Sequence, residues 1–379
     1  MRSANEKPGV ETSASDAPSD NAAEEQILKI RDLKVHFPMR HGTVKAVDGL
    51  DLDLAQGETL GLVGESGCGK SVTAQAILRV IPKPGTIAGG SIEWRMTGNS
   101  VGEAHADDSS RTADRGHFVD IASLSDKDAL LDTIRREEIS MIFQEPMTSL
   151  SPVHTIGNQI MEACLLTGRM TKREARERAI ELLDQVGIPK PEQRIDRYTF
   201  ELSGGMRQRA MIAMALASDP KLLIADEPTT AIDVTIQAQI MELLRRLQSE
   251  TGMALIIITH DLGVVASMAD RMEVMYRGRV VERAQCTELF DNPKHPYTRG
   301  LLASVPDLTV PGKSEIQTIR GTVPNPVAIV PGCQFHPRCR HFMKGVCDVR
   351  FPGESYFGES HTARCHLYSE GVTNESENA

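Results

Sequence analysis

The segment GESGCGKS at residues 64–71 constrains the fold more than any other feature of the chain. It matches the pattern GxxxxGK followed by Ser or Thr, and it lies between the apolar run TLGLV at 59–63 and a helix predicted over residues 71–80. Glycines in such a loop let backbone N–H groups wrap a phosphate, and the following helix adds its positive end. The pattern therefore predicts a P-loop, in which Lys70 reaches the β- and γ-phosphates and Ser71 binds Mg²⁺. Cys68 within it is interpreted as a small spacer rather than a nucleophile.

The periodicity of the remaining chain predicts an α/β fold. Alternating apolar and polar residues over 27–53 indicate short antiparallel strands. The largely apolar runs at 222–226 and 254–260, each preceded by a helical pattern, are typical of parallel strands buried on both faces. Apolar residues three and four apart over 172–186, with charges between them, predict an amphipathic helix.

Three segments lack these patterns. Residues 1–26 have a small, polar and acidic composition and are expected to form a disordered tail. Residues from about 96 to 120 are polar and aperiodic, so we expect a surface insertion. Prolines become frequent after about residue 290, and we place a domain boundary there.

Charge and hydropathy exclude some function classes. The chain has 42 basic and 52 acidic residues, a net charge of -10, which argues against broad coating of nucleic acid. Its longest uninterrupted apolar run has eight residues, at 210–217, whereas a membrane-spanning helix needs about 20. The first 26 residues lack the apolar segment of a secretory signal, so we expect a cytosolic location.

Acidic and histidine side chains follow two of the predicted parallel strands. Asp226 and Glu227 end the first strand, where the first acid is placed to hold Mg²⁺ through water and the second to orient or deprotonate an attacking water. His260 ends the second strand and should stand at the same carboxyl edge, within reach of the γ-phosphate. The two strands therefore predict that Asp226, Glu227 and His260 gather at one edge of the sheet, beside the P-loop.

The segment LSGGMRQR at 202–209 resembles the signature of the nucleotide-binding subunit of ATP-binding cassette (ABC) transporters. Ser203, Gly204 and Gly205 open a predicted helix and so form an anion site. The resemblance covers about residues 27–290 and implies an ABC-type P-loop NTPase core, with an antiparallel β subdomain and a helical subdomain at about 150–215. It also implies that the signature faces the P-loop of a second subunit, with two ATP molecules held in a head-to-tail dimer.

The resemblance assigns a role to each matching residue. Gln144 in FQEP resembles the Q-loop, Asp233 in TTAID the D-loop and His260 the switch histidine. The implied catalytic residues are Glu227, His260, Gln144 and Lys70, and the implied Mg²⁺ ligands are Ser71, Gln144 and Asp226. The implied nucleotide contacts are Gly64, Glu65, Ser66, Gly67, Cys68, Gly69, Lys70, Ser71, Val72, Ser203, Gly204, Gly205 and Asp233.

The adenine-stacking aromatic has two candidates. Counting back from Gly57 without gaps leads to His41, and the nearest aromatic residue is Phe37. Phe37 fits a core position equally well.

The C-terminal segments NPKHPYT, GTVPNP, GCQFHPRC and RCH resemble the extension of peptide-importer ATPases, at 291–379. The resemblance implies an ATPase that powers import of dipeptides or oligopeptides. It implies two membrane permease subunits, a second ATPase that is a paralogue or a copy of this chain, an extracytoplasmic substrate-binding protein, and a peripheral place at the inner face of the cell membrane. Importers of nickel, glutathione or microcin-like peptides are alternatives. A soluble ABC ATPase acting on DNA or ribosomes is disfavoured, because the chain has one P-loop, one signature and no sustained heptads.

Four cysteines occur in the last fifth of the chain, at Cys333, Cys339, Cys347 and Cys365. Their spacing does not match the CxxC pattern of zinc fingers. Some peptide-importer ATPases resemble iron–sulfur proteins in this region, and four thiolates suit a 4Fe–4S cluster. A cluster, a zinc ion and four unliganded thiols remain open interpretations of this set.

Overall fold

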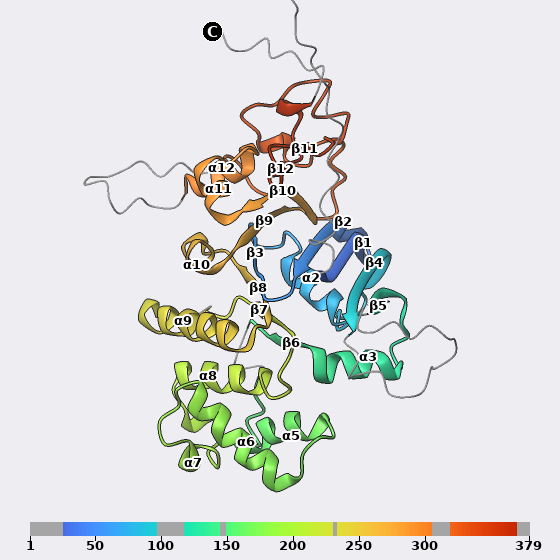
Figure 1. The fold of residues 1–379 in the computed structure, drawn as a ribbon. Helices are drawn as coiled ribbons and strands as arrows, with labels where there is room; N and C mark the ends of the chain where they lie inside the picture. Colours follow the sequence, from blue (N-terminus) through green and yellow to red (C-terminus); the bar gives the residue numbers. More distant parts are fainter. Residues whose placement is uncertain (1–25, 97–116, 145–148, 230–232, 305–318, 370–379) are drawn as a thin grey trace, which may run out of the picture.

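Two β-sheets organise the structure, a computed structural model that describes residues 26–96, 117–144, 149–229, 233–304 and 319–369 (Figure 1). The strands are β1 (Gln26–Met39), β2 (Gly42–Ala55), β3 (Thr59–Val63), β4 (Thr86–Met96), β5 (His117–Asp120), β6 (Ile139–Ile142), β7 (Leu222–Asp226), β8 (Ala254–Thr259), β9 (Arg271–Tyr276), β10 (Arg279–Gln285), β11 (Ser355–Tyr356) and β12 (Thr362–Ala363).

Helices connect and cover these strands. They are α2 (Lys70–Ile77), α3 (Ala129–Thr133), α5 (Ile156–Leu166), α6 (Lys172–Gln185), α7 (Pro191–Arg194), α8 (Gly204–Ala215), α9 (Val234–Thr251), α10 (Leu262–Met268), α11 (Cys286–Asp291) and α12 (Pro296–Leu302). Short 3-10 helices are η2 (Ile121–Ser123), η4 (Thr199–Glu201), η5 (His336–Arg338) and η6 (His366–Tyr368), and η3 (Ile134–Glu138) is a π-helix.

The two sheets differ in strand direction. The smaller sheet has the order β2-β1-β4-β5, and all its pairs are antiparallel. The larger has the order β11-β12-β10-β9-β3-β8-β7-β6, with parallel pairs from β9 to β6. Every residue of β7 and β8 is buried, and residues 48–55 of β2 alternate between buried and partly exposed. The predicted α/β fold, with its antiparallel and buried parallel strands, is confirmed.

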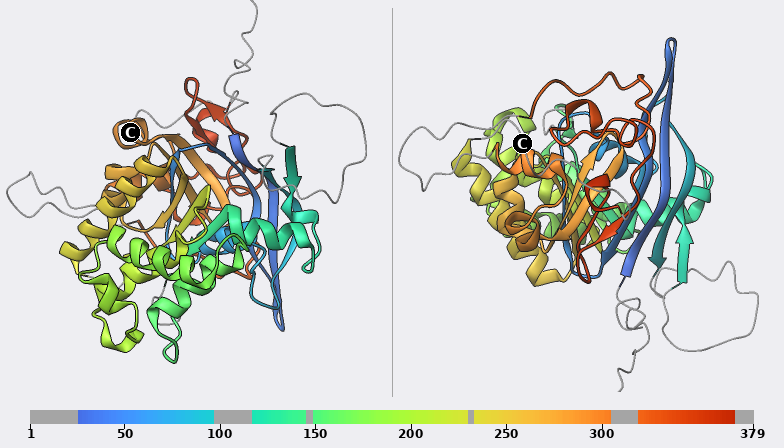
Figure 2. Two further views of the ribbon diagram at one scale, coloured as in Figure 1. Left: turned by 60° about the horizontal axis from the view of Figure 1, so that its bottom comes forward. Right: turned by 90° about the horizontal axis from the view of Figure 1, so that it is seen from above.

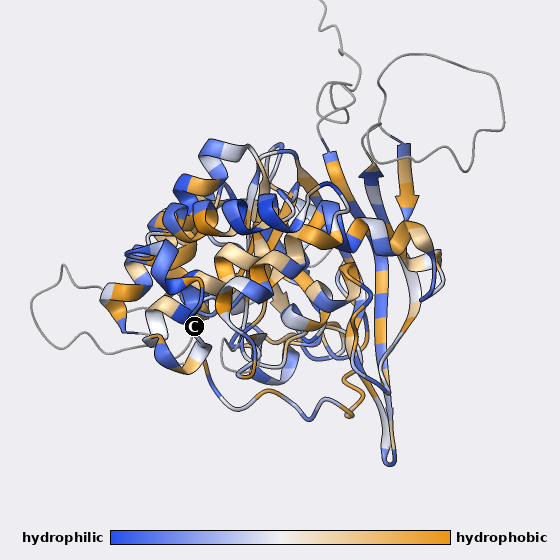
Figure 3. Ribbon diagram, turned by 90° about the horizontal axis from the view of Figure 1, so that it is seen from below, coloured by the Kyte–Doolittle hydropathy of each residue, from blue (hydrophilic) through white to orange (hydrophobic). Residues whose placement is uncertain are grey.

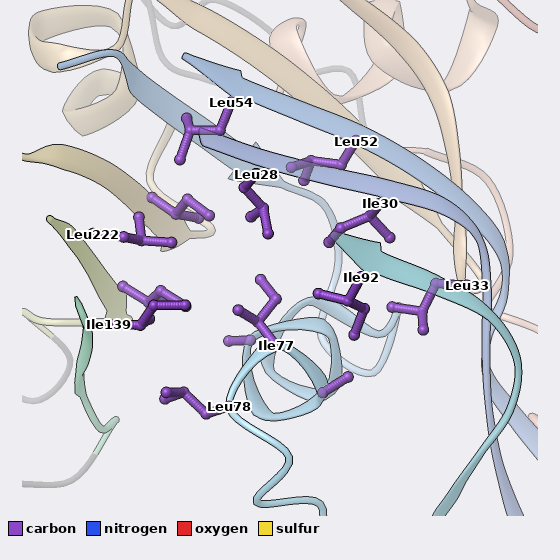
Figure 4. Close-up of a cluster of buried hydrophobic side chains, with 14 of the residues drawn as sticks. Leu28, Ile30, Leu33, Leu52, Leu54, Ile77, Leu78, Ile92, Ile139 and Leu222 are labelled. Atoms are coloured by element: carbon purple, nitrogen blue, oxygen red, sulfur yellow. The ribbon is translucent and has the colours of Figure 1, made fainter. Parts of the chain in front are cut away.

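The helix α2, which follows the P-loop, is held between the two sheets (Figure 4). Its Ile77 belongs to one buried cluster with Leu28 and Ile30 of β1 and with Ile139 and Leu222 from the parallel sheet. Each of these side chains is almost completely buried, and burial of one such side chain contributes roughly 1.5–3 kcal/mol. The core therefore fixes the start of α2 relative to the ends of the parallel strands.

Helices α5, α6, α8 and α9 share a second buried cluster with the opposite face of the parallel sheet, with α9 and α8 nearer the sheet and α5 and α6 beyond α8 (Figures 1 and 2). The amphipathic helix predicted over 172–186 is α6, whose Ala175, Ala179 and Leu182 are fully buried. It begins with a capping box, in which Thr171 and Glu174 satisfy each other's backbone N–H groups. Coloured by hydropathy, the helices show hydrophilic and hydrophobic residues interspersed along their length (Figure 3). Among the helices in the described ranges, none has the length and apolar character that a membrane span requires.

The predicted boundaries of the tail and of the insertion differ from those in the structure. Strand β1 already begins at Gln26, and residues 1–25 lie outside the described ranges. The expected insertion at 96–120 is too wide, because β4 extends to Met96 and residues 117–120 form β5. The apolar Phe118 and Val119 allow this short segment to pair with β4, where Val119 lies opposite Trp94. Residues 97–116 lie outside the described ranges.

The C-terminal extension shares a core with the central sheet. Its strand β12 pairs with β10, so the boundary expected near residue 290 does not separate two sheets. Tyr297 and Phe335 of the extension pack on Tyr276 of β9, with ring centroids 4.7 and 5.3 Å from the Tyr276 ring. These aromatic contacts place the extension against β9, which is one of the two strands beside β3.

The buried His295 should make the stability of this core depend on pH. Burial lowers its pKa to about 3, with a smaller contribution from Arg299. The unfolded chain takes up a proton on this residue near pH 6.5, whereas the folded chain does not until about pH 3. We therefore expect this group to lower the free energy of unfolding, by up to about 1.4 kcal/mol per pH unit, as the pH falls between these values.

Urea denaturation at several pH values from 7.5 to 4.5 measures this effect. His295→Asn is the matched variant, because Asn keeps a side-chain acceptor at the start of α12, where His295 Nδ1 accepts from Tyr297 N–H. Equal pH slopes for the two proteins would contradict the assignment.

Candidate nucleotide-binding site

The P-loop leaves the buried strand β3 in a conformation that needs glycine. Gly64 and Gly69 have φ angles of +149° and +108°. A Cβ atom at Gly64 would lie 2.3 Å from the carbonyl oxygen of Met275, and one at Gly69 would lie 2.2 Å from that of Ala46. Side chains are therefore excluded at both positions, and the loop packs directly against the backbone of β9 and β2.

Lys70 folds back across this loop. Its ammonium group donates to the carbonyl oxygens of Gly64 at 2.7 Å and Glu65 at 3.1 Å, and only 5% of the residue is exposed. The thiol of Cys68 lies 3.7 Å from the same ammonium group, and burial raises the pKa of this thiol although Lys70 opposes the shift. A buried neutral thiol agrees with the interpretation of Cys68 as a spacer.

Ser71 and Asp226 bring two oxygen ligands together. The hydroxyl group of Ser71 donates to Asp226 Oδ1 at 3.0 Å, across the gap between α2 and the end of β7. Burial raises the pKa of Asp226, the Ser71 hydrogen bond lowers it, and the neighbouring Glu227 raises it further. Hydroxyl and carboxylate oxygens are ligands that Mg²⁺ prefers, so this pair fits the predicted metal position.

Glu227 lies at the meeting point of three strand ends. Its Oε2 accepts from Gln144 Nε2 at 2.9 Å, and its Oε1 lies 3.4 Å from His260 Nδ1. Gln144 follows β6, Glu227 follows β7 and His260 follows β8, so the parallel sheet itself assembles the three side chains. The Glu227 side chain is 15% exposed and that of His260 is 67% exposed, which leaves the histidine open to a ligand.

The backbone of Glu227 is unusual for a residue with a side chain. Its φ angle is +46°, in the left-handed region, and its N–H donates to the carbonyl oxygen of Ile258 at 2.8 Å. Left-handed residues other than glycine are uncommon and cluster at functional sites. The hydrogen bond to β8 holds Glu227 in this conformation and so directs the carboxylate towards Gln144 and His260.

The predicted signature and D-loop residues lie at two exposed helix starts. Ser203 caps α8, with its hydroxyl oxygen 3.4 Å from the Met206 N–H, and both Ser203 and Gly204 are exposed. Asp233 caps α9 and accepts from the Ile236 N–H at 2.9 Å. Residues 230–232 of the TTAID segment lie outside the described ranges. The signature thus begins a helix of the helical layer, away from the P-loop helix α2 (Figure 1).

The two candidates for adenine stacking have different surroundings. His41 lies exposed in the turn between β1 and β2. Phe37 is partly buried against the main core, and a Cβ atom at Gly85 would lie 2.4 Å from its ring. Phe37 therefore makes the packing contacts of a core residue, and adenine stacking by either residue stays a prediction.

One contact to the P-loop was not predicted from the sequence. Arg338 of the extension binds the Glu65 carboxylate with two hydrogen bonds, at 2.6 and 2.9 Å, and the Glu65 N–H donates to the Tyr297 hydroxyl group at 2.9 Å. Arg338 and Glu65 are 273 residues apart, so no local pattern joins them. Bidentate arginine–carboxylate pairs are among the stronger hydrogen-bonded contacts, so the extension holds the second residue of the loop.

The four C-terminal cysteines are thiols in the structure. Burial raises the pKa of Cys333 to about 11 and that of Cys365 to about 12, and the neighbouring cysteines add to both shifts. Across the described ranges, however, no three His, Cys, Asp or Glu side chains form a group that could hold a metal ion. The described residues therefore give no support for the iron–sulfur cluster predicted from the sequence.

Two family models match the chain in succession. The model "ABC transporter" matches residues 47–230, which include the P-loop, Glu227 and the signature. The model "Oligopeptide/dipeptide transporter, C-terminal region" matches residues 281–347, which include Arg338 and Tyr297.

Curated relatives match over nearly their full length. The dipeptide transport ATP-binding protein DppD of Bacillus subtilis is 45% identical over 344 residues, which cover 90% of this chain and 95% of that protein. The oligopeptide transport ATP-binding protein AppD of the same species is 45% identical, over 92% of this chain and 99% of AppD. A probable peptide ABC transporter ATP-binding protein of Sinorhizobium fredii is 46% identical, over 93% and 98%.

A solved structure shares the fold of the cassette. The dimeric post-hydrolysis state of the ATP-binding cassette MJ0796, bound to ADP and Pi, has a TM-score of 0.56 and 26% sequence identity, covering 69% of this chain and 99% of that one. Combined with the P-loop, the Glu227 cluster and the signature, these matches show that the chain belongs to the ABC transporter family, among its ATP-binding proteins.

Proposed function

We propose that this chain is the ATP-hydrolysing subunit of an ABC importer of dipeptides or oligopeptides. The observation that carries the proposal is the convergence of Gln144, Glu227 and His260 beside Lys70 and the Ser71–Asp226 pair. The peptide specificity rests on the relatives, whose names describe dipeptide and oligopeptide transport, and on the matching C-terminal region.

Each residue of the cluster has a part in hydrolysis. Lys70 would exchange its two carbonyl contacts for the β- and γ-phosphate oxygens, and Ser71, Asp226 and Gln144 would hold Mg²⁺, which would supply charge neutralisation for the phosphates. Glu227 orients the attacking water and accepts its proton. His260, which faces solvent beside Glu227, contacts the γ-phosphate and stabilises its developing charge.

We infer that the exposed signature faces a second subunit. Ser203, Gly204 and Gly205 open α8 and form an anion site, which would face the P-loop of another ATPase, either a copy of this chain or a paralogue. The related cassette MJ0796 is a dimer by its title, which supports this arrangement. Two ATP molecules then lie between two subunits, and their hydrolysis opens the dimer.

Ser203→Arg tests this arrangement. The large side chain should block the anion site, so we expect ATP hydrolysis to fall by roughly 100-fold or more, while ATP binding to the subunit's own P-loop stays within about twofold. Phosphate release and calorimetric ATP binding measure the two quantities. Ser125→Arg, in an exposed turn before α3, is the matched control. Unchanged hydrolysis in Ser203→Arg would refute the role of the signature.

Among its described residues, this chain has no helix that could span a membrane. In the proposed importer, other subunits provide the membrane-spanning helices. We infer two permease subunits, an extracytoplasmic substrate-binding protein and a peripheral position at the inner face of the cell membrane. Co-purification from native membranes with mass spectrometry tests the set. Peptide permeases and an ATPase partner support the proposal, whereas ribosomal or DNA-repair proteins alone would leave the ATP site standing and overturn peptide import.

The iron–sulfur cluster at Cys333, Cys339, Cys347 and Cys365 stays a prediction from the sequence. No step of ATP hydrolysis depends on it. Iron and acid-labile sulfide, measured per chain after anaerobic purification, test it directly, since a 4Fe–4S cluster requires about four of each. A protein without either would rule the cluster out.

A further inference from the structure

A cavity of about 140 Å³ lies within the C-terminal extension, apart from the nucleotide site. Its lining comes from three segments, which are α12 with the following Ala303, residues 319–320, and four residues within 335–341. None of the P-loop residues lines it. Sites for drug-sized ligands usually enclose roughly 300–1,000 Å³, so this cavity has room for a small ion and not for a nucleotide.

The lining of this cavity is strongly basic. Four arginines contribute to it, namely Arg299, Arg320, Arg338 and Arg340. Among the described residues that form its walls, none is Asp or Glu, and His341 is the only other one with an ionisable side chain. The four arginines come from all three segments, so the fold of the extension gathers their charges at one place.

Arg338 is the buried arginine of the cavity. Its side chain is only 4% exposed, and its guanidinium group pairs with the Glu65 carboxylate at 2.6 Å. It also donates from Nε to the carbonyl oxygen of Arg320 at 3.1 Å. The charge of Arg338 is therefore already balanced by Glu65, and its second contact fixes the backbone of Arg320 at the cavity wall.

The other three arginines are exposed and lack a carboxylate partner. Arg299 donates only to neutral oxygens, the Pro293 carbonyl at 2.9 Å and the Tyr368 hydroxyl group at 3.1 Å. Within the part of the chain that the structure describes, neither Arg320 nor Arg340 has a side-chain hydrogen bond or ion pair. Three positive charges thus meet at the cavity without a counter-charge from the described residues.

The remaining walls of the cavity strengthen the effect of these charges. They are partly apolar, with Pro296 and Ala303 on the side of α12 and Ile319 and Phe335 on the other segments. A cleft that has charges of one sign and walls of low dielectric constant focuses the electrostatic potential and concentrates counter-ions. A bound anion would also relieve the repulsion among the three guanidinium groups.

We propose that this cavity binds a small phosphate anion, either inorganic phosphate or pyrophosphate. The planar guanidinium fork of arginine matches the oxygens of a phosphate group. An anion with two or more negative charges answers the three unbalanced arginines better than chloride or a single carboxylate does. The anion bridges α12 to residues 319–320 and 335–341, and so holds the extension together beside the arginine that binds the P-loop.

Calorimetric titration of the full-length protein with phosphate and with pyrophosphate tests the proposal. A saturating non-hydrolysable ATP analogue fills the P-loop beforehand, and about 0.15 M chloride screens weak surface attraction. We expect Arg320→Gln and Arg340→Gln each to lower the affinity for the anion by about 10-fold. Both side chains are exposed and without partners among the described residues, so the variants should fold.

Arg350→Gln is the matched control, because Arg350 is exposed in the same extension and does not line the cavity. Its affinity for the anion should stay within about twofold of the wild type. Tighter binding of pyrophosphate would assign the site to the diphosphate, and equal or tighter binding of phosphate would assign it to the free ion.

Three results would overturn the proposal. One is a wild-type protein that binds neither anion while the P-loop is filled. Another is unchanged affinity in both Arg320→Gln and Arg340→Gln, because the anion would then lie elsewhere. The third is an equal loss in Arg350→Gln, which would mean that the anion responds only to the net charge of the extension.

Discussion

Glu227→Gln is expected to lower the rate of ATP hydrolysis by roughly 10²–10⁴-fold while ATP binding is retained. The amide keeps the shape of the carboxylate and can still contact Gln144 and His260, which lie 2.9 and 3.4 Å from the two carboxylate oxygens. It cannot accept the proton of the attacking water, so the chemical step alone is lost. Steady-state phosphate release and calorimetric ATP binding separate the two effects.

A second readout follows from the proposed dimer. Because hydrolysis reopens the ATP-bound pair, Glu227→Gln should accumulate as a dimer in the presence of ATP, which size-exclusion chromatography detects. Glu181→Gln is the matched control, since Glu181 forms an exposed ion pair with Arg178 on α6, far along the chain from the cluster. Phosphate release at the wild-type rate would refute Glu227 as the base.

Lys70→Ala should weaken ATP binding by about 100-fold or more. The substitution removes the cation that the fold places inside the P-loop, and truncating one partner of a buried charged contact costs roughly 2–5 kcal/mol. It also leaves the carbonyl oxygens of Gly64 and Glu65 without their lysine donor. Fluorescent-nucleotide titration measures the loss, together with thermal unfolding to verify that the variant folds.

Lys172→Ala provides the comparison for Lys70→Ala. Lys172 is exposed at the first position of α6, so its removal changes the net charge equally without touching the loop. ATP affinity within about twofold of the wild type in Lys70→Ala would contradict the P-loop assignment.

The parts of the site that could be predicted from the sequence are those encoded locally. The P-loop is a strand, a glycine loop and a helix within 20 residues of chain, and its backbone conformation needs glycine at fixed positions. Glu227 and His260 each follow an apolar strand, and parallel strands bring their carboxyl ends to one edge. For the P-loop, Glu227 and His260, the local sequence pattern and the packing of parallel strands therefore predict the same neighbouring residues.

The contacts made by the extension could not be predicted in this way. Arg338 and Glu65 meet because β12 pairs with β10 and the aromatic residues Tyr297 and Phe335 pack on β9, and none of these contacts has a sequence period. The short strand β5 could not be predicted from the sequence for a related reason. Its four residues carry too little alternation to stand out from the polar segment before them.

The pairing of β12 with β10 also limits how such a chain can be divided. A chain cut after β10 would end in an open sheet edge, with unpaired backbone N–H and C=O groups where Glu282 and Arg283 now meet Ala363 and Thr362. The cut would also uncover the ring of Tyr276, which the extension now buries. Open edges beside apolar surface favour aggregation, so the extension cannot be lost or exchanged as an independent module unless the cassette gains another cover for that edge.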